Sequence, residues 1–167
     1  MKTRKVDGSE QVRFASDFLD FFFDRHASTH AGFFIEYVKS NMKILDCGCG
    51  PGSITLDLAE LVSPGQAIGF DVEPSYIEKA KMLQEIRKTT NVKFQVGDVN
   101  ELPFKDDTFD AAFAHGVIEY FRDPVHAFRE IRRVLKRKGV FGARLYLRRH
   151  TTVGLQTSML PARWVGS

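Results

Sequence analysis

The sequence has few cysteines and lacks long apolar runs. Its two cysteines, Cys47 and Cys49, stand at C-x-C spacing, which suits neither a disulfide nor the roughly four ligands of a closed zinc site. We therefore predict two reduced thiols and no metal. No run of about eighteen uncharged apolar residues occurs, and Met1 to Lys5 do not begin an apolar signal region. We expect a cytoplasmic protein without a transmembrane segment.

Acidic residues are absent from the last part of the chain. From Ile131 onward there are nine Lys and Arg residues and no Asp or Glu, although the net charge of the whole chain is only +3. Such a basic end is compatible with contact to nucleic acid or to an anionic membrane. Because no nucleic-acid motif or aromatic platform accompanies it, we favour a solvated helix end followed by a basic tail.

Apolar segments at strand and helix spacing alternate through the middle of the chain. The patterns predict strands near 43–46, 67–71, 92–96, 109–113 and 140–147, with helices over 54–62, from Pro74 onward, and over 124–136. Strands that alternate with helices in this way predict a parallel α/β sheet with right-handed crossovers. At 167 residues the chain has the length of one domain.

Aromatic residues are dense before the first strand. Phe14, Phe18, Phe21 and Phe22 share one face of a predicted helix. Ser28 or Thr29 could cap a second helix, which would carry its apolar face at 34, 35 and 38 and end near 40–41. This aromatic segment suits either ordinary packing or a cap over an apolar substrate. We expect a helical cap over 1–40, a core over 41–147 and an atypical basic tail over 148–167.

A glycine turn follows the first strand, with Gly48, Gly50 and Gly52 at alternate positions after Asp46. Glycines allow positive φ and close approach of a ligand to the backbone, and the next helix offers free N–H groups. A plain strand-turn-helix corner is the alternative. Asp71 lies 23 positions after Gly48, where an acid reaches a ribose diol in dinucleotide-binding folds. That spacing alone does not distinguish a nicotinamide cofactor from S-adenosylmethionine. The dinucleotide pattern G-x-G-x-x-G/A requires Gly or Ala at position 53, where this chain has Ser53, so the sequence favours S-adenosylmethionine.

Five ordered motifs carry a family resemblance. They are Ile44-Leu45-Asp46-x-Gly48-x-Gly50-Pro51-Gly52, Gly69-Phe70-Asp71, Gly97-Asp98-Val99, Leu102-Pro103-Phe104 with Phe109-Asp110, and Glu130-Ile131-x-x-Val134-Leu135-Lys136-x-x-Gly139. Over residues 41–147 the chain resembles the class I S-adenosylmethionine-dependent methyltransferases, above all the small-molecule branch of ubiquinone and menaquinone biosynthesis. The resemblance implies a Rossmann-like sheet of order 3-2-1-4-5-7-6. The residues after the fifth strand are too few for strands 6 and 7, so we expect order 3-2-1-4-5 with the N-terminal helical cap.

The resemblance also implies the site. Asp46 would order the turn near the methionyl amino group, and Asp71 would accept the ribose hydroxyls. Asp98 would accept the adenine amino group. The full set implied to bind S-adenosylmethionine is Asp46, Gly48, Cys49, Gly50, Gly52, Asp71, Val72, Asp98, Val99 and His115. Each of these residues also has a plain structural reading, as a local cap, turn or filler.

The motifs do not assign a catalytic residue. His115 is a weak candidate because it matches the place beside the transferable methyl more than the residue type. Glu119 and Tyr120 stand where many relatives carry histidines, and His126 is expected to face solvent on its helix.

The predicted function is methyl transfer from S-adenosylmethionine to a small acceptor, apolar if the aromatic segment covers it, with S-adenosylhomocysteine as product. The short C-terminal part raises an alternative, a non-catalytic S-adenosylmethionine-binding or scaffold protein derived from a truncated methyltransferase. A nicotinamide-dependent oxidoreductase is a weaker third reading. An uncovered fifth strand would be an exposed edge, which a second copy or a partner chain could cover.

Overall fold

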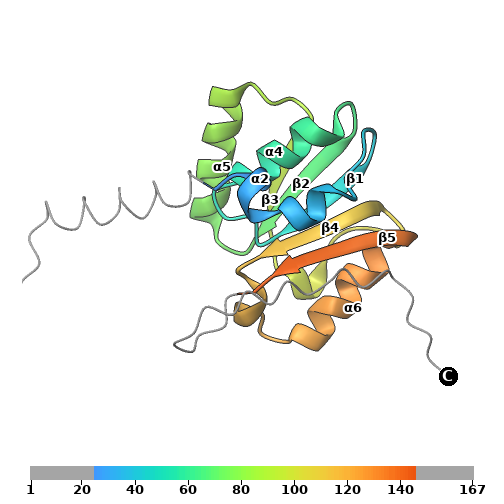
Figure 1. The fold of residues 1–167 in the computed structure, drawn as a ribbon. Coiled ribbons are helices and arrows are strands. Elements are labelled where there is room, and N and C mark those ends of the chain that lie inside the picture. Colours follow the sequence, from blue (N-terminus) through green and yellow to red (C-terminus); the bar gives the residue numbers. More distant parts are fainter. Residues whose placement is uncertain (1–24, 146–167) are drawn as a thin grey trace, which may run out of the picture.

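Residues 25–145 are the part of the chain that the computed structural model describes. They contain a five-stranded sheet of order β3-β2-β1-β4-β5, in which every neighbouring pair is parallel (Figure 1). The strands are β1 (Lys43–Cys47), β2 (Gln66–Asp71), β3 (Val92–Val96), β4 (Phe109–His115) and β5 (Leu135–Arg144). The predicted fold class and strand order are confirmed.

Helices cover both faces of the sheet. One face packs against α2 (Ala27–His30), α3 (Gly32–Ile35), α4 (Ser53–Val62) and α5 (Pro74–Arg87), and the other against α6 (Pro124–Val134), η1 (Val99–Glu101) and η2 (Ile118–Tyr120). Figure 1 shows α6 on the opposite side of the sheet from α4 and α5. Ile44 and Leu45 are both fully buried, one in the core of each face. Burial on both faces explains why the strands are near-continuous apolar runs.

Two helices begin where their sequences predict. Glu73 accepts the Ser75 N–H at 3.1 Å ahead of α5, and Asp123 accepts the His126 N–H at 3.0 Å ahead of α6. A proline occupies the first turn of each helix, where its missing N–H has no intrahelical partner in any case.

The boundary between α6 and β5 differs from the prediction of a helix to 136 and a strand from 140. The helix ends at Val134 and the strand begins at once, because Leu135 pairs with Phe109 on β4. Val140 is the next residue in register, opposite Ala111, so 136–139 form an irregularity in the strand. There the Lys136 ammonium lies 2.7 Å from Asp110, an ion pair that sequence periodicity does not indicate.

The predicted second helix before β1 is also corrected. Two short helices, α2 and α3, meet at Ala31, and neither is capped by the side chain of Ser28 or Thr29. Instead a carboxylate from α4, Asp57, accepts the Ala27 N–H at 2.8 Å. Phe34 is fully buried, as its place on the apolar face predicted.

Two predicted segments, the aromatic helix over Phe14–Phe22 and the basic tail over 148–167, lie outside the described residues. None of the helices within 25–145 is long and apolar enough to cross a membrane.

Candidate functional site

The predicted site residues gather at the carboxyl edge of the sheet. Asp71 ends β2, the glycine turn follows β1, Asp98 follows β3 and His115 ends β4. The strand order reverses between β1 and β4, which are hydrogen-bonded neighbours. In open parallel sheets ligands bind at such a reversal, outside the carboxyl ends of the strands.

The glycine turn is packed against other side chains at both ends, at Gly48 and at Gly52, and is open at Gly50 in its middle. All three glycines have positive φ, with values of +73° at Gly48, +53° at Gly50 and +84° at Gly52. A Cβ added to Gly48 would lie 2.4 Å from a methyl carbon of Val117, in the loop after β4. A Cβ added to Gly50 would meet no atom of residues 25–145 within 4 Å. The Gly50 backbone therefore faces space that a ligand can enter.

Asp71 joins the end of β2 to this turn. One carboxylate oxygen accepts the Gly50 N–H at 2.8 Å, and the other accepts the Glu73 N–H at 2.9 Å. A carboxylate has about four acceptor sites, so Asp71 can still accept two ligand hydroxyls. The next residue, Val72, is 70% exposed and offers an apolar contact beside the acid.

Asp46 is a buried acid near the end of β1, two residues before the first glycine of the turn. Its Oδ2 accepts the Thr55 hydroxyl of α4 at 2.6 Å. Burial, with a smaller contribution from the nearby Asp71 charge, raises the pKa of Asp46 to about 7, against the lowering effect of the Thr55 hydrogen bond. Such a carboxyl gains from a cation placed beside it. Thr55 was not predicted, because no spacing rule links a strand residue to a helix hydroxyl nine positions later.

Asp98 is held by a residue that the sequence analysis also missed. Its Oδ1 accepts both the backbone N–H and the side-chain amide of Asn100, each at 2.8 Å. These two hydrogen bonds, foremost that of the backbone, lower the pKa of Asp98, so it is a carboxylate at neutral pH. The Val99 side chain is buried in the core, which leaves its backbone for any ligand contact.

His115 lies deeper than its sequence position indicates. It is only 6% exposed, its ring meets that of His30 edge-on at 5.2 Å between centroids, and it stacks on Phe113 at 6.3 Å. Burial first, then the positive charges of Arg25, His30 and Arg144, lower the pKa of His115 to about 3. The imidazole is neutral at pH 7 and a weak base.

Two other candidates, Tyr120 and His126, lie on the surface, whereas the cysteines lie in or beside the glycine turn. Tyr120 is exposed on η2, whereas His126 is exposed on α6, which confirms that it faces solvent. Cys47 and Cys49 are free thiols, and burial raises the pKa of both. Among residues 25–145, no group of three His, Cys, Asp or Glu side chains is placed to hold a metal ion.

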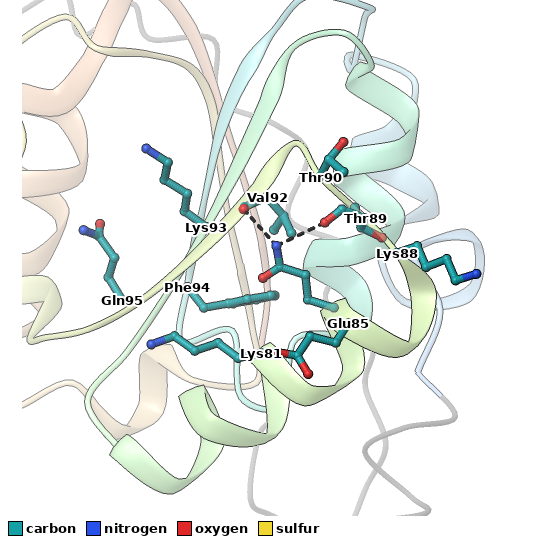
Figure 2. A pocket seen from close by; sticks show the side chains of 10 residues that line it. Lys81, Glu85, Lys88, Thr89, Thr90, Val92, Lys93, Phe94 and Gln95 are labelled. Carbon is teal, nitrogen blue, oxygen red and sulfur yellow. Dashed lines mark hydrogen bonds between the residues drawn. The ribbon is translucent and has the colours of Figure 1, made fainter.

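A groove of about 760 Å³ lies at a different place, between α5 and β3 at the edge of the sheet (Figure 2). The Gln84 amide crosses it and donates to the backbone oxygens of Thr89 at 3.1 Å and Val92 at 3.4 Å. Lys81, Lys88 and Lys93 border the groove and none of the predicted site residues lines it. It is therefore separate from the carboxyl edge.

The fold and the carboxyl edge together define an α/β protein of the Rossmann-like, nucleotide-binding class. A family model described as a methyltransferase domain matches residues 38–151, and the chain belongs to this family. The methyl donor of the family is S-adenosylmethionine. The resemblance predicted from the five motifs is thereby confirmed.

Known proteins with similar sequences or folds agree with this assignment. The chain is 33% identical over 141 residues to an uncharacterised methyltransferase of Schizosaccharomyces pombe, across 78% of this chain and 51% of that protein. It is 35% identical over 99 residues to the chloroplastic 2-methyl-6-phytyl-1,4-hydroquinone methyltransferase 2 of Oryza sativa subsp. japonica, across 59% of this chain and 28% of that protein. A solved S-adenosylmethionine-dependent methyltransferase of Aquifex aeolicus has the same fold, with a TM-score of 0.70 and 21% identity over 90% of this chain and 78% of that one. The chain thus spans about half or less of the length of these two curated relatives.

Proposed function

We propose that the chain binds S-adenosylmethionine at the carboxyl ends of β1, β2 and β3 and passes its methyl group to a small molecule held beside β4. The observation that carries this proposal is the open backbone at Gly50, whose N–H donates to Asp71, with the buried acid Asp46 just before the same turn. An open turn flanked by acids suits a ligand that carries hydroxyls and positive charge. Residues 41–147 would form the donor-binding core, with 1–40 as a cap and 148–167 as a tail.

Each predicted binding residue has a role in this proposal. Asp46 holds the methionyl ammonium, and Asp71 accepts the ribose hydroxyls. Val72 packs on the adenine, while Asp98 and the backbone of Val99 bind its polar edge. The turn that wraps the methionyl and ribose portions consists of Gly48, Cys49, Gly50 and Gly52.

The chemistry asks for position more than for reactive side chains. Bound S-adenosylmethionine supplies a methyl group on a positively charged sulfur, which makes that carbon electrophilic. Holding two reactants in line can remove about 7–11 kcal/mol from a barrier. Here the glycine turn fixes one side, and the His115–Val117 segment, in contact with Gly48, borders the other. His115, neutral and buried, would orient an acceptor beside the donor.

Calorimetric titration of the full chain with S-adenosylmethionine and S-adenosylhomocysteine tests the proposal. We expect micromolar binding that weakens at least about tenfold, or 1.4 kcal/mol, in Asp71→Ala. Asp71→Asn is measured as a second variant, because its amide oxygen still accepts one backbone N–H but the side chain carries no charge. Glu85→Ala, which removes an acid from the groove at β3, is the matched control and should bind like wild type. A folded wild-type chain that binds neither ligand would contradict the proposal.

A further inference from the structure

Asn100 holds one oxygen of Asp98 through two separate hydrogen bonds. Its backbone N–H and its side-chain Nδ2 both donate to Oδ1 of Asp98, each at 2.8 Å. The backbone bond alone would cap the short helix η1, whose N-cap residue is Asp98. The side-chain bond is additional, so η1 does not need an amide at position 100 in order to form.

The same amide leaves a polar atom unpaired inside the protein. Asn100 is only 4% exposed, and its Oδ1 is buried without a hydrogen-bond partner among residues 25–145. An unpaired buried acceptor destabilises the folded state, because the atom gives up its water and gains no partner. An apolar side chain of similar size would avoid this loss. The amide is therefore better explained by what it does for Asp98 than by packing.

The segment that carries Asn100 is fastened to α6. Directly after η1, the Leu102 N–H donates to the Glu130 carboxylate at 3.1 Å, and the Leu102 carbonyl accepts the Arg133 guanidinium at 2.9 Å. Glu130 and Arg133 both belong to α6, which packs on the sheet. Asn100 is thus a fixed donor, and a carboxylate that it holds keeps its orientation.

This arrangement gives the two oxygens of Asp98 different tasks. A carboxylate oxygen has about two acceptor sites, and at Oδ1 Asn100 occupies both. Oδ2 accepts no hydrogen bond from the described part of the chain, and Asp98 is partly exposed, so Oδ2 is the oxygen left for a ligand. The two hydrogen bonds from Asn100, followed by the charge of Arg122, lower the pKa of Asp98 against the effect of burial. At neutral pH Asp98 is therefore a carboxylate, which accepts hydrogen bonds and cannot donate them.

A fixed acceptor that cannot donate discriminates between purine bases. Adenine carries an amino group that donates a hydrogen bond to a carboxylate. Hypoxanthine carries a carbonyl oxygen at the same ring position, and a carboxylate repels it. A site built to pair with a donor group rejects the analogue that lacks this group, because the acceptor is then left unpaired. A carboxylate free to turn away from the carbonyl oxygen would reject hypoxanthine less strongly.

We infer that Asn100 is a positioning residue for the nucleoside part of the donor: by holding Oδ1 of Asp98 it keeps Oδ2 as a fixed acceptor, and the site thereby selects a 6-aminopurine over a 6-oxopurine. This inference rests on the proposed function, in which Asp98 binds the adenine. Asn100 acts through Asp98, so its effect is on ligand binding and not on the transfer of the methyl group.

Calorimetric titration of the full chain with S-adenosylhomocysteine and with S-inosylhomocysteine, its 6-oxo analogue, measures this selectivity as a ratio of dissociation constants. We expect wild type to prefer the amino compound at least about tenfold. Asn100→Leu keeps a side chain of similar size and the backbone N–H, but it removes Nδ2 and the unpaired oxygen. Its preference should fall at least about fivefold. Its free energy of unfolding without ligand, measured in urea, should equal or exceed that of wild type.

Asn91→Leu is the matched control, because it removes a structural amide at the opposite end of β3. The Asn91 Nδ2 donates to the backbone carbonyls of Ala59 at 2.6 Å and Gly65 at 3.0 Å. Loss of these bonds should lower the free energy of unfolding and leave the ratio of the two dissociation constants as in wild type. The two variants thus separate an effect on stability from an effect on selectivity.

Asn100→Asp tests the donated hydrogen bond itself. A protonated carboxyl at position 100 can donate to Asp98 as the amide does, whereas an ionised one cannot. Two carboxyls this close share a proton at low pH, so the preference of this variant for the amino compound should rise as the pH falls from about 8 to about 5. The wild-type preference should stay nearly constant. Asp46, whose pKa is about 7, affects the binding of both compounds alike and cancels in the ratio.

Two results would overturn the inference and leave the proposed function in place. They are a wild type that binds both compounds equally well, and a folded Asn100→Leu chain that keeps the wild-type preference. If Asn100→Leu does not fold, the pH profile of Asn100→Asp decides, and a flat profile counts against the inference. A folded wild-type chain that binds neither compound would contradict the proposed function, and the inference would fall with it.

Discussion

The ligand-free domain should be more stable with Asp46→Asn than as wild type, and the difference in the free energy of unfolding should grow as the pH rises. The side chain is buried, and its pKa is about 7 in the folded chain against an ordinary value of 3.8. Between about pH 4 and 7 the folded state therefore holds a proton that the unfolded state has released. Stability falls as the pH rises through this window, because ionisation of a buried acid opposes folding. At about 1.4 kcal/mol for each pKa unit, the loss approaches about 4 kcal/mol.

Asparagine keeps the size of the side chain and can still accept the Thr55 hydroxyl, but it cannot ionise. Urea unfolding of wild type and Asp46→Asn, without ligand and at steps from about pH 5 to 8, measures the difference. We expect the advantage of the variant to grow with pH and to level off above about pH 8. Asp71, the other acid that acts on Asp46, is present in both proteins and cancels in the comparison. Parallel pH profiles for the two proteins would refute this reasoning.

The same variant should bind donor less well although it is more stable. A methionyl ammonium beside Asp46 favours its ionised form, and the asparagine offers no charge in return. Titration with S-adenosylhomocysteine, which keeps the ammonium, should show at least about tenfold weaker binding. Unchanged affinity would place the ammonium away from Asp46.

Three further substitutions, the first with a matched control, test the fold that supports the site. Gly52→Ala should lower the free energy of unfolding by about 2 kcal/mol or more, since φ is +84° and the new Cβ would lie 2.7 Å from the Phe94 ring. In the matched variant Gly32→Ala the new Cβ meets no atom of the described part of the chain within 4 Å, so thermal melting should be nearly unchanged. Arg133→Met should cost about 2 kcal/mol in urea unfolding, because its guanidinium joins α6 to the loop before β4 through the backbone carbonyls of Leu102 and Phe104 and the carboxylate of Asp106. A loss that vanishes in high salt would argue for charge alone. Phe34→Ala should cost about 3–5 kcal/mol, and a loss below 1 kcal/mol would mean that α3 is not docked on the sheet.

Local features of the sequence were enough to predict the parallel sheet and the place of the glycine turn and its acids at the carboxyl edge of that sheet. The strands are short apolar runs that end in an acid or lead into glycine, and these signals lie within a few residues of one another. Parallel strands in alternation with helices then bring their carboxyl ends to one edge. The positions of Asp46, Asp71 and the glycine turn at that edge follow from this rule without further information.

Contacts between distant segments decided the rest. The sequence around 136 suits a helix as well as a strand, and the pairing of Leu135 with Phe109 on β4 ends α6 early. The folded chain also brings together His30, His115 and Arg144, which are separated by 85 and 29 positions in the sequence. No periodicity encodes such a meeting, because it depends on how α2 docks and on which strand lies beside β4. The sequence by itself therefore determined which acids and glycines meet at the carboxyl edge of the sheet, and the tertiary structure decided which side chains from distant segments lie beside them, because that depends on long-range packing.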